Sequence, residues 1–66
     1  MKIVVNGESR EVAKPISVTE LVDMLGFAGR RVAVEVNEDI VPRSRHDEHR
    51  LAEGDRVELV AAIGGG

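Results

Sequence analysis

The chain has 66 residues, a formal net charge of −3 and no cysteine. A chain of this length forms one small domain without room for a deep active-site cleft, which favours a carrier, adaptor or subunit over an autonomous enzyme. Without cysteine, disulfides, thiol catalysis and thiolate metal sites are excluded. The single aromatic residue and the mixed charges argue against nucleic-acid binding, and no apolar run approaches the ~20 residues of a membrane-spanning helix. We therefore expect a cytoplasmic protein with no bound cofactor or metal.

The N-terminal segment predicts a β-hairpin. Its turn is Asn6-Gly7, a pair that favours a type I′ turn because both central residues need positive φ. Ile3 and Val5 lie on one face of the first strand by the two-residue period. Pro15 ends the pairing of the second strand because it has no N–H to donate.

The next segment predicts a helix with both ends marked. Ser17 and Glu20 have the spacing of a capping box, and Ile16 and Leu21 that of a hydrophobic staple. The apolar positions follow one helix face: Val18, Leu21, Val22 and Leu25. Gly26 suits the left-handed residue that ends a helix, followed by an apolar residue as in a Schellman motif.

Two strands follow, separated by a turn. Valines at every second position from Val32 to Val36 predict a strand with one apolar face. Residues 37–39 turn the chain, and Ile40 and Val41 form a brief second strand. These two strands add to the sheet that the hairpin begins.

The polar segment 43–55 predicts a short helical turn. Ser44 followed by Asp47 is a possible cap for that turn, and Leu51 is expected to point into the core. Gly54-Asp55 then turns the chain toward the last strand.

The last strand is expected over residues 56–63 and is apolar enough to lie inside the sheet. Its inner face holds Val57, Leu59, Ala61 and Ile63, and its outer face holds Glu58, Val60 and Ala62. We expect an α+β domain over residues 1–63. It has a mixed four- to five-stranded sheet, with the first and last strands side by side and one main helix on one face.

Three glycines, residues 64–66, follow that strand directly and form an expected flexible tail. Chain ends are often mobile, and terminal glycines can be residues added for protein expression. The tail alone therefore does not indicate a function. Glycine nevertheless has no Cβ, so a glycine tail can enter a narrow channel, and three residues reach ~10 Å. The terminal carboxylate of Gly66 has a pKa of ~3.5 and is a poor electrophile at neutral pH, so chemistry there needs activation by ATP. No phosphate-binding loop is present, so another enzyme must use the ATP.

The chain resembles the ubiquitin-like β-grasp sulfur carriers of the ThiS/MoaD family, and most closely its thiamine-pathway members. The resemblance covers essentially the whole chain and rests on "SVTELVDMLG", "VEVNEDIVPRS" and "LAEGDRVELVAAIGGG". It implies a β-grasp fold and a protein cosubstrate that is not itself an enzyme. A ThiF-like adenylyltransferase would adenylate Gly66, and sulfur from a cysteine desulfurase would convert it to a thiocarboxylate. A ThiG-like thiazole synthase would use that sulfur, while Gly64 and Gly65 would lie in the partners' active sites.

Two alternatives to a thiamine-pathway carrier share this tail chemistry. One is a sulfur carrier for molybdopterin or another pathway, and the other is a ubiquitin-like conjugation tag joined to lysine. A plain interaction domain, in which the glycines have no function, is a third possibility.

Other polar motifs are weaker candidates for function. His46 and His49 lie one helical turn apart, but two ligands do not complete a metal site, so we expect none. The adjacent carboxylates at 38–39 and 47–48 are interpreted as surface charge. The arginines at 30–31, 43 and 45 are interpreted in the same way, although arginines can also steer an acidic partner toward the protein. On the sheet face away from the helix, Val4, Val60 and Ala62 are a possible docking surface for partner proteins.

Overall fold

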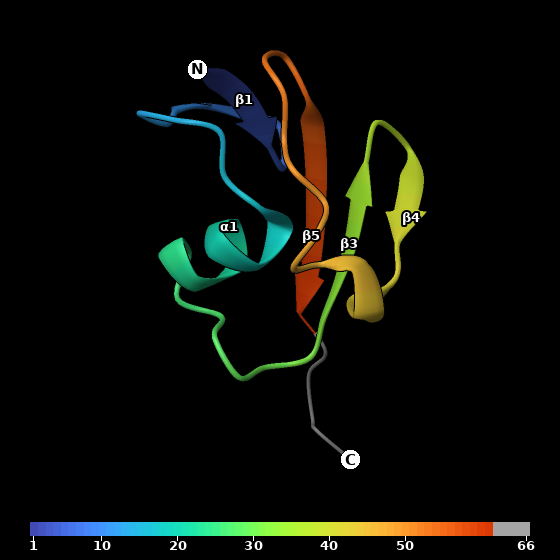
Figure 1. Ribbon diagram of the computed structural model, residues 1–66. Helices are drawn as coiled ribbons and strands as arrows, with labels where there is room; N and C mark the ends of the chain where they lie inside the picture. The colour runs from blue at the N-terminus through green and yellow to red at the C-terminus, as the bar shows by residue number, and fades with distance from the viewer. Residues whose placement is uncertain (62–66) are drawn as a thin grey trace.

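The computed structural model describes residues 1–61 and shows a five-stranded mixed sheet with one α-helix (Figure 1). The elements in chain order are β1 (Lys2–Val5), β2 (Glu8–Glu11), α1 (Val18–Met24), β3 (Val32–Val36), β4 (Asp39–Val41), the 3-10 helix η1 (Arg43–Arg45) and β5 (Arg56–Ala61). The strand order is β2-β1-β5-β3-β4. The predicted α+β architecture is confirmed; the predicted domain boundary after residue 63 lies outside the described residues.

β5 lies in the middle of the sheet, as its apolar sequence predicts. It pairs in parallel with β1, where Val4 aligns with Arg56. On its other side it runs antiparallel to β3 over five residue pairs, from Val36–Val57 to Val32–Ala61. The predicted pairing of first and last strands is therefore confirmed.

The first hairpin has the predicted turn. Asn6 and Gly7 have φ values of 49° and 83°, so both central residues are left-handed, as a type I′ turn requires. The same geometry recurs between β3 and β4, where Asn37 and Glu38 have φ values of 53° and 73° without any glycine. This second turn carries backbone strain that must be offset by other contacts.

The helix begins and ends at the predicted signals. The Ser17 hydroxyl accepts from the Glu20 N–H at 3.1 Å, and the Glu20 carboxylate accepts from the Ser17 N–H at 2.9 Å, which completes the capping box. At the other end Gly26 has a φ of 85°, and the Phe27 N–H donates to the Val22 carbonyl at 3.0 Å, as in a Schellman motif. Local residues thus supply hydrogen bonds at both ends of the helix.

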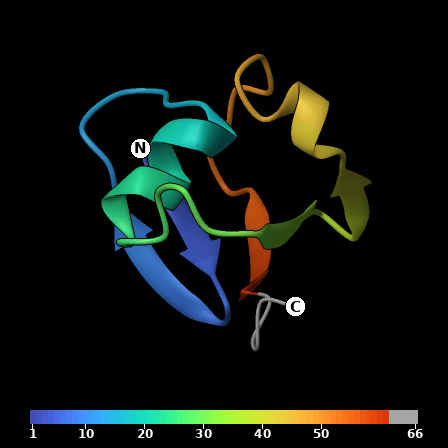
Figure 2. The ribbon, with the colours of Figure 1, turned by 90° about the horizontal axis from the view of Figure 1, so that it is seen from below.

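The segment between β4 and β5 packs over the start of the helix (Figure 2). The Val18 N–H donates to the His49 carbonyl at 3.0 Å, and the Thr19 N–H donates to the His46 carbonyl at 3.1 Å. These bonds satisfy helix N–H groups that have no partner within the helix. The predicted cap at Ser44 is wrong: Pro42 precedes η1, Ser44 lies inside it, and no side chain caps it. Longer-range backbone bonds to α1 order this segment instead.

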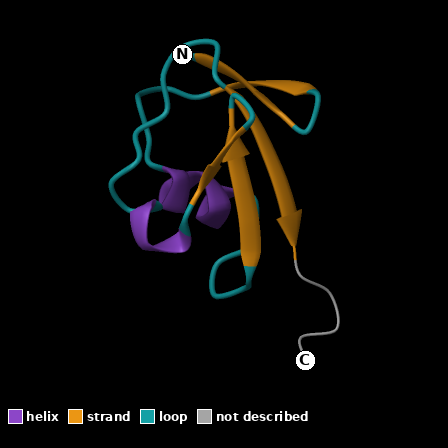
Figure 3. Cartoon of the chain, turned by 90° about the vertical axis from the view of Figure 1, so that its right-hand side faces the viewer, coloured by secondary structure: helices purple, strands orange, loops and turns teal. Residues whose placement is uncertain are grey.

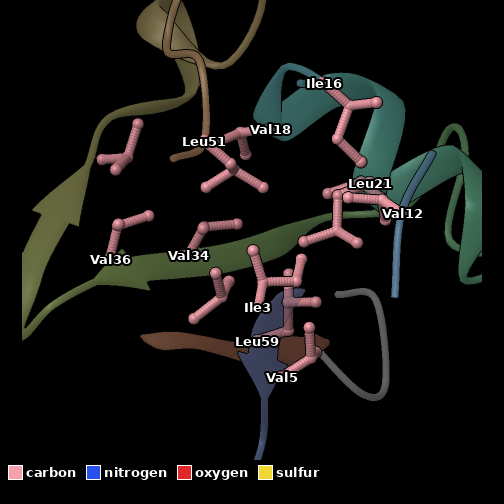
Figure 4. Packing of buried hydrophobic residues seen from close by; sticks show 13 residues of the cluster. Ile3, Val5, Val12, Ile16, Val18, Leu21, Val34, Val36, Leu51 and Leu59 are labelled. Carbon is pink, nitrogen blue, oxygen red and sulfur yellow. The ribbon is translucent and has the colours of Figure 1, made fainter. Parts of the chain in front are cut away.

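The core lies between the helix and one face of the sheet (Figures 3 and 4). Its thirteen buried apolar residues come from every strand except the exposed β2, from α1 and from the segments that join them. Leu51, which is 2% exposed, projects into this core as predicted. The opposite face of the sheet has no helix over it in the described part of the chain.

Candidate functional site

The candidate site is the C-terminal end of β5, from which the chain continues into the glycine tail. Gly64, Gly65 and Gly66 lie outside the described residues, as do Ala62 and Ile63. The last described pair in the sheet joins Ala61 to Val32, beside the start of β3 (Figure 1). What the structure defines is therefore the base from which the tail extends.

The Asn6 side chain fixes the middle of β5. Its Oδ1 accepts from the Leu59 N–H at 2.8 Å, and its Nδ2 donates to the Leu59 carbonyl at 3.2 Å. The side chain thus continues the ladder between β1 and β5 after the backbone of β1 has turned away. The sequence indicated only the backbone preference of Asn6; its side-chain contact with Leu59 joins residues 53 positions apart, and no local signal predicts it.

The Asn37 side chain fixes the start of the same strand. Its Oδ1 accepts from the Arg56 N–H at 3.0 Å, and its Nδ2 donates to the Asp55 carboxylate at 3.0 Å. Its backbone N–H also donates to the Arg56 carbonyl at 2.7 Å. These bonds offset the strain of the turn without glycine. Each type I′ turn therefore supplies an asparagine that holds β5.

Of the predicted docking residues, Val4 and Val60 lie on the outer face of the sheet, but not side by side. Val4 is half-buried and aligns with Arg56, whereas Val60 is 66% exposed and lies opposite Ala33 in β3. Four strand positions, or ~13 Å, separate the levels of Val4 and Val60. Ala62 is outside the described residues. The docking surface stays a prediction, and its exposed apolar part is Val60.

The polar side chains of the segment after β4 make contacts within the fold. His46 Nε2 lies 3.0 Å from the Val41 carbonyl, and the Thr19 hydroxyl donates to Asp47 at 2.5 Å. Within residues 1–61 no group of three or more potential metal ligands converges. No helix in this part of the chain is long and apolar enough to cross a membrane.

Two carboxyl groups have a lowered pKa, and both make structural contacts. The Ser17 N–H, which bonds to the Glu20 carboxylate, lowers the pKa of Glu20. The terminal ammonium of Met1, 2.9 Å from Glu11, lowers the pKa of that carboxyl. Both groups are exposed and hold element ends, so neither shift indicates acid–base catalysis.

Comparisons with known proteins agree with this architecture. The ThiS family matches residues 3–66. The crystal structure of a thiamine biosynthesis protein (ThiS) from Geobacter metallireducens superimposes with a TM-score of 0.83 at 36% identity, covering all of both chains. The sulfur carrier protein ThiS of Escherichia coli is 32% identical over 66 residues, the full length of both proteins.

Longer proteins contain a similar region. A thiazole synthase of Paramagnetospirillum magneticum is 46% identical over all 66 residues, and one of Magnetococcus marinus is 41% identical. This chain spans about a fifth (20%) of the length of each. Matching sequence over nearly the whole chain and a β-grasp structure at full coverage show that the chain belongs to the ThiS family.

Proposed function

We propose that the chain is a sulfur carrier of thiamine biosynthesis and that its C-terminal Gly66 carries the sulfur as a thiocarboxylate. The observation that carries this proposal is the family match over residues 3–66, which includes the glycine tail. The full-length relative named sulfur carrier protein ThiS supports the same role.

The proposed chemistry begins with ATP. An ionised carboxylate resists attack by a nucleophile, so a partner adenylyltransferase of the ThiF type transfers AMP to it and releases pyrophosphate. A sulfur nucleophile then forms a C–S bond as the C–O bond to AMP breaks. Where that nucleophile is a persulfide, a further thiol must cleave the S–S bond to release the thiocarboxylate. This chain has no cysteine, so every thiol in that sequence belongs to its partners.

The fold suits a protein cosubstrate. β5 is a central strand, and Asn6 and Asn37 hold it at two positions, so the strand that leads to the tail is anchored within the sheet. The three glycines are narrow and reach ~10 Å, which is enough to place a carboxylate inside a partner's active site while the domain stays outside. The domain provides recognition, and the partner enzymes provide catalysis.

Two relatives support a thiazole synthase as the partner that receives the sulfur. Proteins of that name contain a region 41–46% identical to this whole chain, so carrier and synthase occur there in one polypeptide. The proposal also assigns the activation step to a ThiF-type enzyme and the supply of sulfur to a cysteine desulfurase. These relatives also favour the thiamine pathway over the molybdopterin alternative.

The absence of cysteine gives a clean test. The protein is incubated with ATP, a purified ThiF-type adenylyltransferase, a cysteine desulfurase and cysteine, then repurified and treated with iodoacetamide. A thiocarboxylate is the only thiol-like group that the chain can then present, so alkylation of the repurified protein reports the product. We expect ATP-dependent alkylation that is lost when Gly66 is deleted; alkylation without ATP, or none at all, contradicts the proposal.

A further inference from the structure

The turn between β1 and β2 places Asn6 directly before Gly7, and both residues are exposed. The side-chain amide of an asparagine can be attacked by the backbone nitrogen of the next residue. Glycine in that next position hinders the attack least, because it has no Cβ. In the second type I′ turn, Asn37 is followed by Glu38 instead. The two turns therefore share a backbone geometry but differ in this reactivity.

The reaction at Asn6 is a spontaneous deamidation. A bond forms between the Gly7 nitrogen and Cγ of Asn6, and the bond from Cγ to Nδ2 breaks. The amide group leaves as ammonia after taking the proton of the Gly7 N–H. Water then opens the cyclic imide by adding its hydroxyl to one carbonyl carbon and its proton to the ring nitrogen, which gives aspartate or isoaspartate. Water is the only co-reactant, and it reaches this turn because the turn is exposed.

The fold holds the Asn6 side chain in a position that opposes this reaction. Oδ1 accepts from the Leu59 N–H at 2.8 Å, and Nδ2 donates to the Leu59 carbonyl at 3.2 Å. Both ends of the amide are thus bonded to β5, and rotation of the side chain toward the Gly7 nitrogen would break both bonds. The rate of deamidation is then set by how often this part of the hairpin opens.

The products cannot restore the same contact. An aspartate has no N–H to donate, so one carboxylate oxygen would face the Leu59 carbonyl where Nδ2 now lies. An isoaspartate also adds a methylene group to the backbone of a two-residue turn, in which Val5 lies opposite Glu8. Either product weakens the link between the first hairpin and the strand that leads to the tail.

We propose that Asn6-Gly7 is a modification site that the fold keeps closed: Asn6 deamidates when its side chain leaves Leu59, and the product prevents the original contact from forming again. The reaction is irreversible, so modified molecules record past opening of the hairpin. The inference goes beyond the proposed function, because it concerns the domain and does not depend on the chemistry of the tail.

The two asparagines serve as test and control in one protein. The wild type is kept at neutral pH in two samples, one folded and one unfolded in guanidinium chloride, and aliquots are digested with trypsin over time. Asn6 is recovered in the peptide of residues 3–10 and Asn37 in that of residues 32–43. Mass spectrometry measures the replacement of NH2 by OH in each peptide, and a sample taken at the start corrects for deamidation during digestion.

In the unfolded sample, Asn6 should deamidate about tenfold faster than Asn37, and Gly7→Ala should remove most of this difference. In the folded sample, the rate at Asn6 should fall about tenfold or more, because two hydrogen bonds must break first. If Asn6 in the unfolded chain reacts no faster than Asn37, the turn is not a modification site. Equal rates at Asn6 in folded and unfolded protein would show that the contact with Leu59 does not protect it.

A second pair of variants tests the consequence of modification. Asn6→Asp reproduces the aspartate product, and Ser9→Asp adds the same charge to the exposed strand β2, which does not pair with β5. We expect Asn6→Asp to unfold at a lower urea concentration than Ser9→Asp, with circular dichroism as the readout. Equal midpoints would overturn the claim that modification weakens the hold on β5. Since these measurements use neither ATP nor a partner enzyme, their failure would leave the proposed sulfur chemistry unaffected.

Discussion

The two hydrogen bonds from the Asn6 side chain to Leu59 are expected to stabilise the whole domain measurably. Asn6→Gly removes both bonds and keeps a residue suited to the φ of 49°. Asn6→Ala removes the same bonds and places alanine, which tolerates the left-handed region less well than asparagine or glycine, at this position. The backbone bond from the Asn6 N–H to the Val57 carbonyl, 2.9 Å long, is available to all three proteins.

The magnitude follows from these contacts. Each hydrogen bond contributes about 0.5–1.5 kcal/mol net, so Asn6→Gly should lower the free energy of unfolding by about 1–3 kcal/mol. Asparagine tolerates the left-handed region, whereas alanine loses about 1 kcal/mol there, so Asn6→Ala should lose about 2–4 kcal/mol. A domain of this size has about 3–10 kcal/mol in total, so the alanine variant loses a large part of its stability.

Urea unfolding followed by circular dichroism measures both values, because the chain has no tryptophan or tyrosine for fluorescence. Amide hydrogen exchange at Leu59 gives the local readout and should be faster in both variants. If Asn6→Gly unfolds at the wild-type urea concentration and the Leu59 amide exchanges no faster, the side chain contributes nothing and the reasoning is refuted.

Other substitutions test the core and the helix start. Leu51→Ala should lower the free energy of unfolding, measured in urea, by about 2–5 kcal/mol, because the side chain is 2% exposed. Leu51→Met should lower it by less than about 1.5 kcal/mol. Equal losses in the two variants would show that the site does not pack tightly. Ser17→Ala should cost about 1 kcal/mol by removing the acceptor for the Glu20 N–H, and an unchanged urea midpoint would contradict the capping role. The pKa of Glu20 is lowered from 4.5, so its contribution to stability is present above that pH and is lost as the pH falls through the lower folded value. Urea midpoints measured from pH 7 to pH 2 should therefore fall less steeply for Glu20→Gln than for the wild type. Parallel curves would show that the Glu20 carboxylate does not contribute to the loss of stability in acid.

Local signals predicted most of the fold. The first turn, the capping box and the glycine at the helix end are each specified by residues within a few positions of one another, and all three form as predicted. The alternating valines likewise predicted β3, and the apolar last strand predicted its central position.

Contacts between distant segments were not predictable in the same way. The polar segment before β5 has no periodicity, and its order comes from backbone bonds of His46 and His49 to the helix start, so the cap inferred at Ser44 was wrong. The separation of Val4 from Val60 depends on the parallel register of β1 and β5, which no local signal sets. The chemistry assigned to the tail came from resemblance to a family, because three glycines specify no reaction.

The most direct test of the sulfur-carrier proposal is the mass of the C-terminal tryptic peptide. No lysine or arginine follows Arg56, so trypsin releases residues 57–66, which contain the tail and no methionine whose oxidation would mimic the mass change. After incubation with ATP, the adenylyltransferase and the desulfurase system, we expect this peptide to gain the mass of one oxygen replaced by sulfur, on Gly66. A peptide of unchanged mass, or one joined to a lysine of another protein, would contradict the proposal.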